Sequence, residues 1–117
     1  MRLTALLVGA AIAVATVNAG ASFQNGNWLL SRLQEYGRPE SVKRTLSEAF
    51  LEGQASGYIQ GAFDMGAGAF FCPPNSVNVR QILDMVRQFL ESNPARRHEP
   101  ADVLVIDAMK TAFPCKN

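Results

Sequence analysis

Residues 78–91 read NVRQILDMVRQFLE, and no other stretch of the chain predicts an amphipathic α-helix as clearly. Asn78, with Gln81 three residues later, is typical of a capping box at a helix start. Apolar residues then recur at helical spacing on one face, and polar residues occupy the opposite face, with Met85 as the exception. The apolar face consists of Val79, Ile82, Leu83, Val86, Phe89 and Leu90. This stretch indicates an all-α fold, which the rest of the chain extends to a small bundle of about four helices.

A second helix is expected directly downstream, from Ala101 to Phe113. Ser92 to Pro94 ends the preceding helix, and Pro100 suits the first turn of the next one, where its missing N–H costs nothing. The segment is apolar almost throughout, which predicts a central helix that is buried on most sides. Because only about eight residues join the two helices, they should pack as an antiparallel hairpin.

The two cysteines flank this hairpin, with Cys72 before its first helix and Cys115 after its second. The hairpin therefore brings both cysteines to its open end, and in an exported chain they should form a disulfide bond. On the chain-entropy model, closing a loop of roughly 43 residues stabilises the fold by up to about 4 kcal/mol. A paired cysteine cannot act as a nucleophile or as a thiolate ligand.

Two further helices are expected upstream of Cys72. The first follows Asn25-Gly26-Asn27 and ends at Gly37. Its apolar residues at helical spacing are Trp28, Leu29, Leu30, Leu33 and Tyr36. Pro39 interrupts the chain after this helix, and a long second helix should run from Val42 to about Gly68.

Gly53, Gly57 and Gly61 are spaced four residues apart inside this long helix and therefore share one face. Each glycine costs a helix about 1 kcal/mol relative to alanine, so the face needs a compensating role. The first explanation is helix packing, in which another helix of the same chain crosses closely where side chains are absent. The alternative is that the face admits a second subunit or a side chain of a partner. A membrane dimer motif is excluded by polar neighbours, which are Gln54, Ser56, Gln60 and Asp64.

Residues 1–21 have the features of a secretory signal peptide. A weakly basic start precedes an apolar run from Leu3 to Val17, and the small residues Ala19-Gly20-Ala21 predict cleavage after Ala21. The rival interpretation is an uncleaved membrane anchor, but a run of roughly 15 residues is short of the roughly 20 needed to span a bilayer. We therefore expect residues 22–117 to form a single exported domain, without a membrane attachment after cleavage.

The charge balance excludes several classes of partner. The chain has 11 basic and 10 acidic side chains, and the loss of Arg2 with the signal peptide makes the two numbers equal. The basic residues are scattered rather than interleaved with aromatic residues. Nucleic acid and anionic membrane surfaces are therefore not expected partners.

The sequence also lacks the residue patterns of a catalytic or metal site. His98 is the single histidine, and no H-E-x-x-H or comparable ligand spacing surrounds it. Asp102 and Asp107 are five residues apart on one helix, so they do not face each other as a general acid and base would. We expect no catalytic residue, no metal and no cofactor, and hence no enzymatic activity.

Seven short motifs carry a family resemblance. They read G-Y-I-x-G-x-x-D at 57–64, F-C-P at 71–73, V-x-x-x-Q-I at 77–82, F-L-x-x-x-P at 89–94, R-H at 97–98, A-x-x-L-V at 101–105 and A-F-P-C at 112–115. In this order and spacing they resemble the Rap/Tai family, over a span from about Asn25 to Cys115. The resemblance implies a small all-helical immunity protein of type VI secretion. Such a protein binds a peptidoglycan-cleaving amidase effector in the periplasm and blocks its active-site cleft, in several members as a homodimer.

One departure from the family pattern concerns cysteines. Many relatives carry a second cysteine pair at the positions that here read Leu33 and Ala55. Both cysteines are absent together, as expected if they form one bridge. The first two helices should therefore be held to each other by packing alone.

Recognition residues of a binding protein should be polar, exposed and carried by a rigid element. The link from Ser92 to Glu99, at the closed end of the hairpin, is therefore the candidate contact segment. Its candidate partner-binding residues are Asn93, Arg96, Arg97 and His98. The alternative is that the link is a solvated connection in which Arg97 and His98 have structural roles.

Two functions remain open at this point. The first is a periplasmic immunity protein without catalysis of its own, whose partners are a cognate amidase effector and, in the family pattern, a second copy of the chain. The second is a small envelope housekeeping protein, such as an acid-stress chaperone or an assembly factor. Helical periplasmic proteins with one disulfide serve in such roles too.

Overall fold

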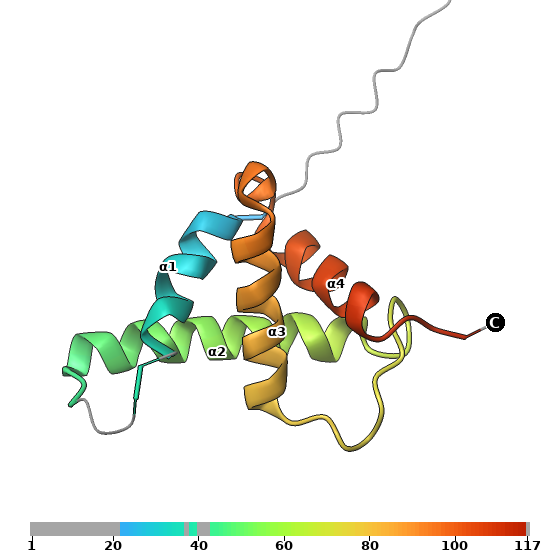
Figure 1. Cartoon of the computed structure of the whole chain (residues 1–117), viewed down its shortest axis with the longest axis horizontal. Helices are drawn as coiled ribbons and strands as arrows, with labels where there is room; N and C mark the ends of the chain where they lie inside the picture. The colour runs from blue at the N-terminus through green and yellow to red at the C-terminus, as the bar shows by residue number, and fades with distance from the viewer. Residues whose placement is uncertain (1–21, 37, 40–42, 117) are drawn as a thin grey trace, which may run out of the picture.

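The computed structural model describes residues 22–36, 38, 39 and 43–116 (Figure 1). Four α-helices form the domain: α1 (Gly26–Tyr36), α2 (Leu46–Gly66), α3 (Val79–Ser92) and α4 (Ala101–Ala112). The short 3-10 helix η1 (Pro94–Arg96) follows α3. The predicted all-α fold is confirmed, and the only β-type pairings among the described residues are two isolated bridges. The expected signal peptide, the helix end at Gly37 and the helix start at Val42 lie outside the described residues.

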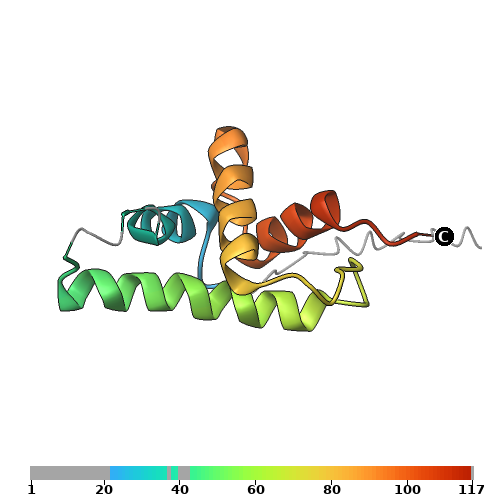
Figure 2. The same cartoon turned by 60° about the horizontal axis from the view of Figure 1, so that its bottom comes forward.

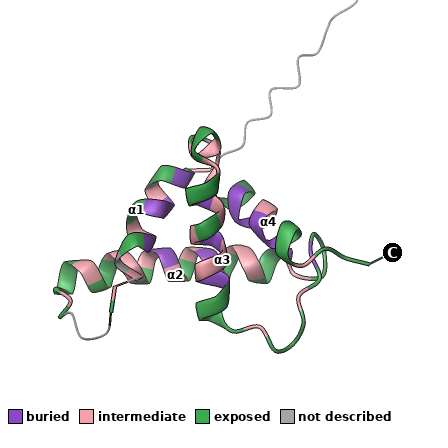
Figure 3. Ribbon diagram, in the orientation of Figure 1, coloured by how far each residue is buried: buried purple, intermediate pink, exposed green. Residues whose placement is uncertain are grey.

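The long helix α2 forms one side of the domain. Figure 2 shows α1, α3 and α4 together on the other side, and each of the three contacts α2. The core lies between these two layers and receives buried residues from all four helices (Figure 3). Its largest fully buried side chains are Leu29, Leu33, Ile59, Phe71, Leu83, Val86, Leu90, Leu104, Val105 and Met109. Burying one such side chain contributes about 1.5–3 kcal/mol, so this core is the main stabilising element.

Helix α3 forms as its sequence predicts. The Asn78 side chain accepts a hydrogen bond from the Gln81 backbone N–H at 3.0 Å, and the Gln81 side chain accepts one from the Asn78 N–H at 3.0 Å. The predicted capping box is thereby confirmed. Most of the predicted apolar face is buried, whereas Val79 at the helix start is exposed.

Helix α4 departs from its prediction. Its buried residues are Ala101, Leu104, Val105, Ala108 and Met109. Val103 is 44 % exposed, so the helix is buried on one face and not on most sides. The expected burial on most sides is therefore wrong, although α4 does contact each of the other three helices. Asp102, Lys110 and Thr111 are exposed together with Val103.

A disulfide bond joins the open end of the hairpin of α3 and α4, opposite the link between the two helices. The two helices are in contact, but α4 diverges from α3 as it runs back, in both views of the fold (Figures 1 and 2). Cys72 and Cys115 are bonded, with their Cα atoms 4.8 Å apart, which confirms the predicted pairing. The Cys72 backbone N–H also donates to the Phe113 carbonyl oxygen at 2.8 Å, so the chain is held at this end by both kinds of bond.

Helices α1 and α2 pack directly against each other. The Asn25 side chain accepts a hydrogen bond from the Trp28 N–H at 2.9 Å and caps the start of α1. Leu33 and Ala55, at the two positions where relatives carry cysteines, are both buried in the core. Packing is not the whole contact, because the Arg32 side chain of α1 donates from Nε to the Gln54 side-chain oxygen of α2 at 3.0 Å. The expectation that packing alone holds these two helices together is therefore wrong.

Helix α2 begins at Leu46, later than the expected start near Val42. Thr45 is the reason, because its side chain accepts a hydrogen bond from the Glu48 N–H at 3.2 Å and the Glu48 carboxylate accepts one from the Thr45 N–H at 2.8 Å. The helix ends at Gly66, close to the expected end, and Gly68 then adopts a φ of 80° that a glycine tolerates best.

The three glycines of α2 do not pack as expected. Gly53, Gly57 and Gly61 are exposed, and a Cβ atom added at any of them would meet no atom within 4 Å. The close crossing by another helix of this chain is therefore wrong. The reason is that α2 turns its opposite side, with Ala55 and Ile59, toward the other helices.

Two other glycines do allow a close approach. A Cβ atom at Gly26 would lie 2.5 Å from Leu104 Cδ1 and 2.9 Å from the Arg97 carbonyl oxygen. A Cβ atom at Gly66 would lie 2.5 Å from Ile106 Cδ1. Gly26 meets backbone atoms of Arg97 as well, so any larger residue there would displace the link, whereas a larger residue at Gly66 would have to push aside the Ile106 and Phe71 side chains.

Candidate functional site

The link between α3 and α4 is held rigidly against the start of α1. The Gly26 N–H donates to the Glu99 carbonyl oxygen at 3.1 Å, and the Asn27 N–H donates to the Arg97 carbonyl oxygen at 3.0 Å. On the other side of the link, the Ala101 N–H donates to the Gln24 carbonyl oxygen at 2.9 Å. The candidate contact segment is thus an ordered part of the fold, as a recognition element requires.

Two of its four candidate residues hold the end of α3. The Asn93 side-chain amide donates to the Phe89 carbonyl oxygen at 2.7 Å. Arg97 donates from Nε to the Leu90 carbonyl oxygen at 2.7 Å and from Nη2 to the Glu91 carbonyl oxygen at 3.1 Å. The last carbonyl groups of a helix have no partner within the helix, so these side chains satisfy them.

Arg96 ties the link to α4. Its guanidinium pairs with Glu99 at 2.5 Å and with Asp107 at 2.6 Å, and it lies 5.7 Å from the centre of the Phe89 ring. Hydrogen bonds to Glu99 and then to Asp107 raise the pKa of the Arg96 guanidinium, which is therefore charged at every physiological pH. Because the Arg96 guanidinium already pairs with two carboxylates of this chain, it is less available to a carboxylate of a partner protein.

His98 is the fourth candidate. Its side chain is exposed, and it forms no hydrogen bond or ion pair with the part of the chain that the structure describes. The structure therefore brings all four residues into one turn but gives three of them internal partners. Arg97 has the structural role that the alternative interpretation assigned to it, and partner binding by this segment stays a prediction.

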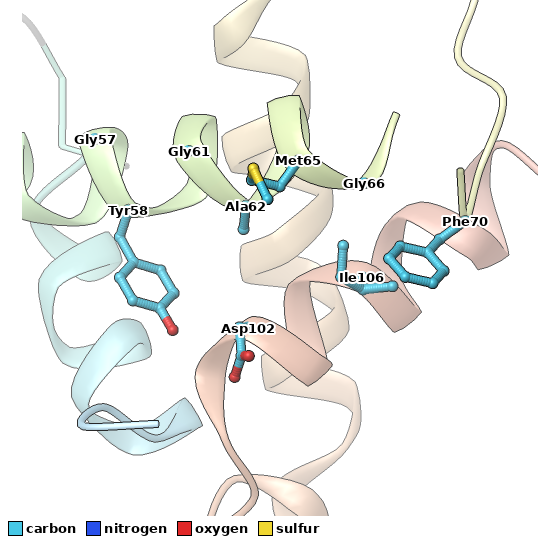
Figure 4. A pocket seen from close by; sticks show the side chains of 9 residues that line it. All are labelled: Gly57, Tyr58, Gly61, Ala62, Met65, Gly66, Phe70, Asp102 and Ile106. Carbon is cyan, nitrogen blue, oxygen red and sulfur yellow. The ribbon is translucent and has the colours of Figure 1, made fainter. Parts of the chain in front are cut away.

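A second surface is a groove between α2 and α4, which we name the α2–α4 groove (Figure 4). Its volume of about 570 Å³ falls within the range of about 300–1,000 Å³ that is common for ligand sites. Two of the glycines from the sequence pattern, Gly57 and Gly61, form part of its wall. The remaining lining residues are Tyr58, Ala62, Met65, Gly66, Phe70, Asp102 and Ile106.

One end of the α2–α4 groove is apolar. Met65, Phe70 and Ile106 lie there, contributed by α2, by the segment after α2 and by α4 (Figure 4). Met65 is 82 % exposed and Phe70 is 60 % exposed. Large apolar side chains are seldom left this open next to one another unless a partner covers them.

The other end of the α2–α4 groove carries its polar groups, Tyr58 and Asp102 (Figure 4). The Tyr58 ring packs edge-on against Trp28 of α1, with the ring centres 5.6 Å apart. Burial raises the pKa of the Tyr58 hydroxyl, and the Asp102 carboxylate raises it further, whereas hydrogen bonds from Ser22 and the Asp102 backbone oppose the shift. Tyr58 is therefore neutral at pH 7, and Asp102 is the charged group of the groove.

The sequence pattern pointed to this surface only in part. The spacing of Gly57 and Gly61 identified an open helix face, and contact with a partner was the alternative explanation for it. Phe70 and Asp102 are far from these glycines along the chain, and no local pattern connects them. Only the packing of α4 against α2 brings them to one groove.

The described residues offer neither a metal site nor a membrane-spanning helix. No group of three or more His, Cys, Asp or Glu side chains among them could hold a metal ion. None of the helices within the described ranges is both long enough and apolar enough to cross a bilayer.

Comparison with known proteins gives one family. The model of the Rap1a immunity proteins matches residues 25–115, a span that includes all four helices and both cysteines. No curated protein matches the chain.

Proposed function

This chain belongs to the Rap1a immunity protein family, and from that premise we propose that it binds a peptidoglycan amidase effector delivered by type VI secretion and blocks the effector's active-site cleft. The family match over residues 25–115 is the observation that carries the proposal. An immunity protein is a non-enzymatic inhibitor that acts by binding its cognate effector. The identity of that effector as an amidase is the proposed part.

The proposed compartment is the periplasm. An amidase that cleaves peptidoglycan acts there, so its inhibitor has to be there as well. The signal-peptide features of residues 1–21 support this location. So does the disulfide between Cys72 and Cys115, because disulfide bonds persist in oxidising compartments and are rare in the cytosol.

The fold supports an inhibitor that binds as a preformed surface. Hydrogen bonds to α1 hold the link between α3 and α4 in place, and the disulfide closes the opposite end of the hairpin. A rigid surface loses less conformational entropy on binding than a mobile one. Inhibition then requires occupation of the effector cleft and no chemical step.

The proposal is tested by co-expression in a bacterium. Amidase effectors encoded beside the gene, exported to the periplasm, should stop growth, and the full-length chain should restore it. The matched control is the same chain without residues 2–21, which should give no protection because it cannot meet the effector. Failure of the full-length chain to protect against every neighbouring effector would overturn the proposal.

A second candidate function has one observation in its favour. Leu46 is 90 % exposed and Phe50 is 64 % exposed, on the part of α2 that extends beyond α1 (Figure 1). An acid-stress chaperone or assembly factor of the envelope uses exposed apolar surface to hold unfolded clients. Such a protein should suppress the aggregation of many clients and bind more hydrophobic dye at low pH, whereas a one-partner inhibitor should do neither.

A further inference from the structure

We propose that the α2–α4 groove is the surface that engages the effector, and that it takes a protein segment in which a large apolar side chain lies next to a lysine or arginine. This inference rests on the proposed immunity function. It goes further by naming the surface and the chemistry of the segment that binds there.

The apolar side chain of the partner segment is inferred from the apolar end of the groove. Met65 and Phe70 are the most exposed large apolar side chains that line it, and Ile106 lies between α2 and Phe70 (Figure 4). These side chains come from α2, from the segment after α2 and from α4, and all three line the groove. A large apolar side chain inserted there would remove all of them from water, which favours binding.

Gly57 and Gly61 carry no side chains, so a partner segment in the groove could approach the α2 backbone closely. Gly57 and Gly61 expose helix backbone, and nothing lies within 4 Å of the position that a Cβ atom would occupy at either residue. The unfavourable helix propensity of these glycines is not offset by packing within the chain. A partner segment can contact the α2 backbone directly at these positions.

The lysine or arginine of the partner segment is inferred from the negative charge of Asp102 in the groove. Asp102 is the single charged residue that lines the groove, and it forms no ion pair with the described residues. The adjoining hollow shares Tyr58 and Asp102 with the groove and adds Ser22, Phe23, Gln24 and Trp28, none of which is basic. A lysine or arginine of the partner would give the Asp102 carboxylate an opposite charge beside an apolar wall.

A second copy of this chain fits the groove less well. If two copies faced each other through this groove, apolar surface would be covered, but neither groove would bring a cation to Asp102. The link between α3 and α4 is also a weaker candidate for the central contact, because Asn93, Arg96 and Arg97 already have internal partners. In the groove, by contrast, Met65 and Phe70 are exposed and Asp102 forms no ion pair with the described residues.

The first experiment fills the groove. Gly61→Leu should project a side chain into it, and Gly53→Leu is the matched control, because Gly53 lies on the same helix with equally open space but does not line the groove. Calorimetry with the purified effector against which the full-length chain protects should show a Kd raised at least about tenfold by Gly61→Leu. Gly53→Leu should leave the Kd unchanged, and circular dichroism should show that both variants are folded.

The second experiment removes the charge. Asp102→Asn should raise the Kd about fivefold to tenfold and flatten its dependence on salt, because one ion pair is lost. Asp64→Asn is the control, since Asp64 is an exposed carboxylate of α2 that does not line the groove. It should change neither the Kd nor the salt dependence.

The outcomes separate this inference from the function on which it rests. If the unmodified chain binds no neighbouring effector, the immunity proposal fails and the inference fails with it. If the unmodified chain binds but Gly61→Leu binds equally well, only the inference is overturned. If Gly61→Leu disrupts a dimer in sedimentation velocity and leaves effector binding intact, the groove belongs to a second copy and the inference is again overturned.

Discussion

Single glycine residues determine how closely the start of α1 and the end of α2 approach neighbouring residues. At Gly26 the α1 backbone lies against Leu104 of α4 and against the Arg97 carbonyl group of the link. At Gly66 the end of α2 lies against Ile106 and Phe71. Neither glycine belongs to the regular spacing that drew attention to Gly53, Gly57 and Gly61. The need for glycine is therefore a property of the neighbours and not of the sequence interval.

Replacement of Gly26 by alanine tests this view. Gly26→Ala should lower the free energy of unfolding by about 1–3 kcal/mol, because the new methyl group overlaps Leu104 Cδ1 and the Arg97 carbonyl oxygen. Gly53→Ala should instead raise it by up to about 1 kcal/mol, because the methyl group fits and helix propensity improves. Urea denaturation measures both values, and a similar effect of the two substitutions would contradict the interpretation.

Tyr58 provides a test of the groove's electrostatics. In a Tyr36→Phe background, the phenolate absorbance of the remaining tyrosine should rise at a higher pH than that of an ordinary tyrosine, since burial and Asp102 raise the pKa of Tyr58. Asp102→Asn should lower the pKa, and Asp64→Asn should not. Because the pKa is higher in the folded state, the stability that this hydroxyl contributes is present below about pH 10 and lost as the pH rises through the folded-state pKa.

At the scale of helices, the caps define where each element begins. Thr45 and Asn78 each form a complete capping box, and Asn25 caps α1 with a single side-chain bond. The Thr45 box explains why α2 begins at Leu46. The end of α3 depends on the side chains of Asn93 and Arg97, which come from the link and not from the helix.

The cap of α3 can be removed by one substitution. Asn78→Ala should lower the free energy of unfolding by about 1 kcal/mol, because the Gln81 N–H loses its acceptor. Ser76→Ala, at an exposed position just before the helix, is the control and should have an effect within about 0.5 kcal/mol of zero. Thermal denaturation of the two variants side by side would show the difference, and equal melting temperatures would contradict the role of the cap.

At the scale of the whole molecule, a disulfide bond closes one half of the fold, and a shared core joins that half to the other. The Cys72–Cys115 disulfide closes the hairpin of α3 and α4, whereas α1 and α2 are joined to it through buried side chains such as Leu33 and Ala55. The half with the disulfide also carries one wall of the α2–α4 groove. The groove shape therefore depends on how α4 is held against α2.

Removal of the disulfide tests this dependence. The double variant Cys72→Ala/Cys115→Ala should lose up to about 4 kcal/mol of unfolding free energy, because a loop of 43 residues is no longer closed in the unfolded state. Chemical denaturation measures the loss, and a reductant should destabilise the unmodified chain but not the double variant. Thiol titration of the denatured, unreduced chain should find no free thiol, and about two thiols per chain would refute the pairing.

Local patterns predicted most of the fold. The capping box of α3, its buried face and the open-end position of the two cysteines all depend on residues close in sequence or on simple hairpin geometry. The burial of α4 was overestimated because apolar composition does not say how many neighbours a helix has. The crossing at Gly53, Gly57 and Gly61 was wrong for a similar reason, since spacing identifies a helix face but not what lies opposite it.

The sequence by itself determined the number of helices, the cap of α3, the disulfide partners and the family, because these follow from local periodicity and from the order of short motifs. The tertiary structure alone decided that Asn93, Arg96 and Arg97 have internal partners, and that Gly61, Phe70 and Asp102 line one groove. The physical reason is that free partners and shared grooves depend on contacts between residues distant in sequence. Those contacts form only when α4 packs against α2 and the link closes onto α1.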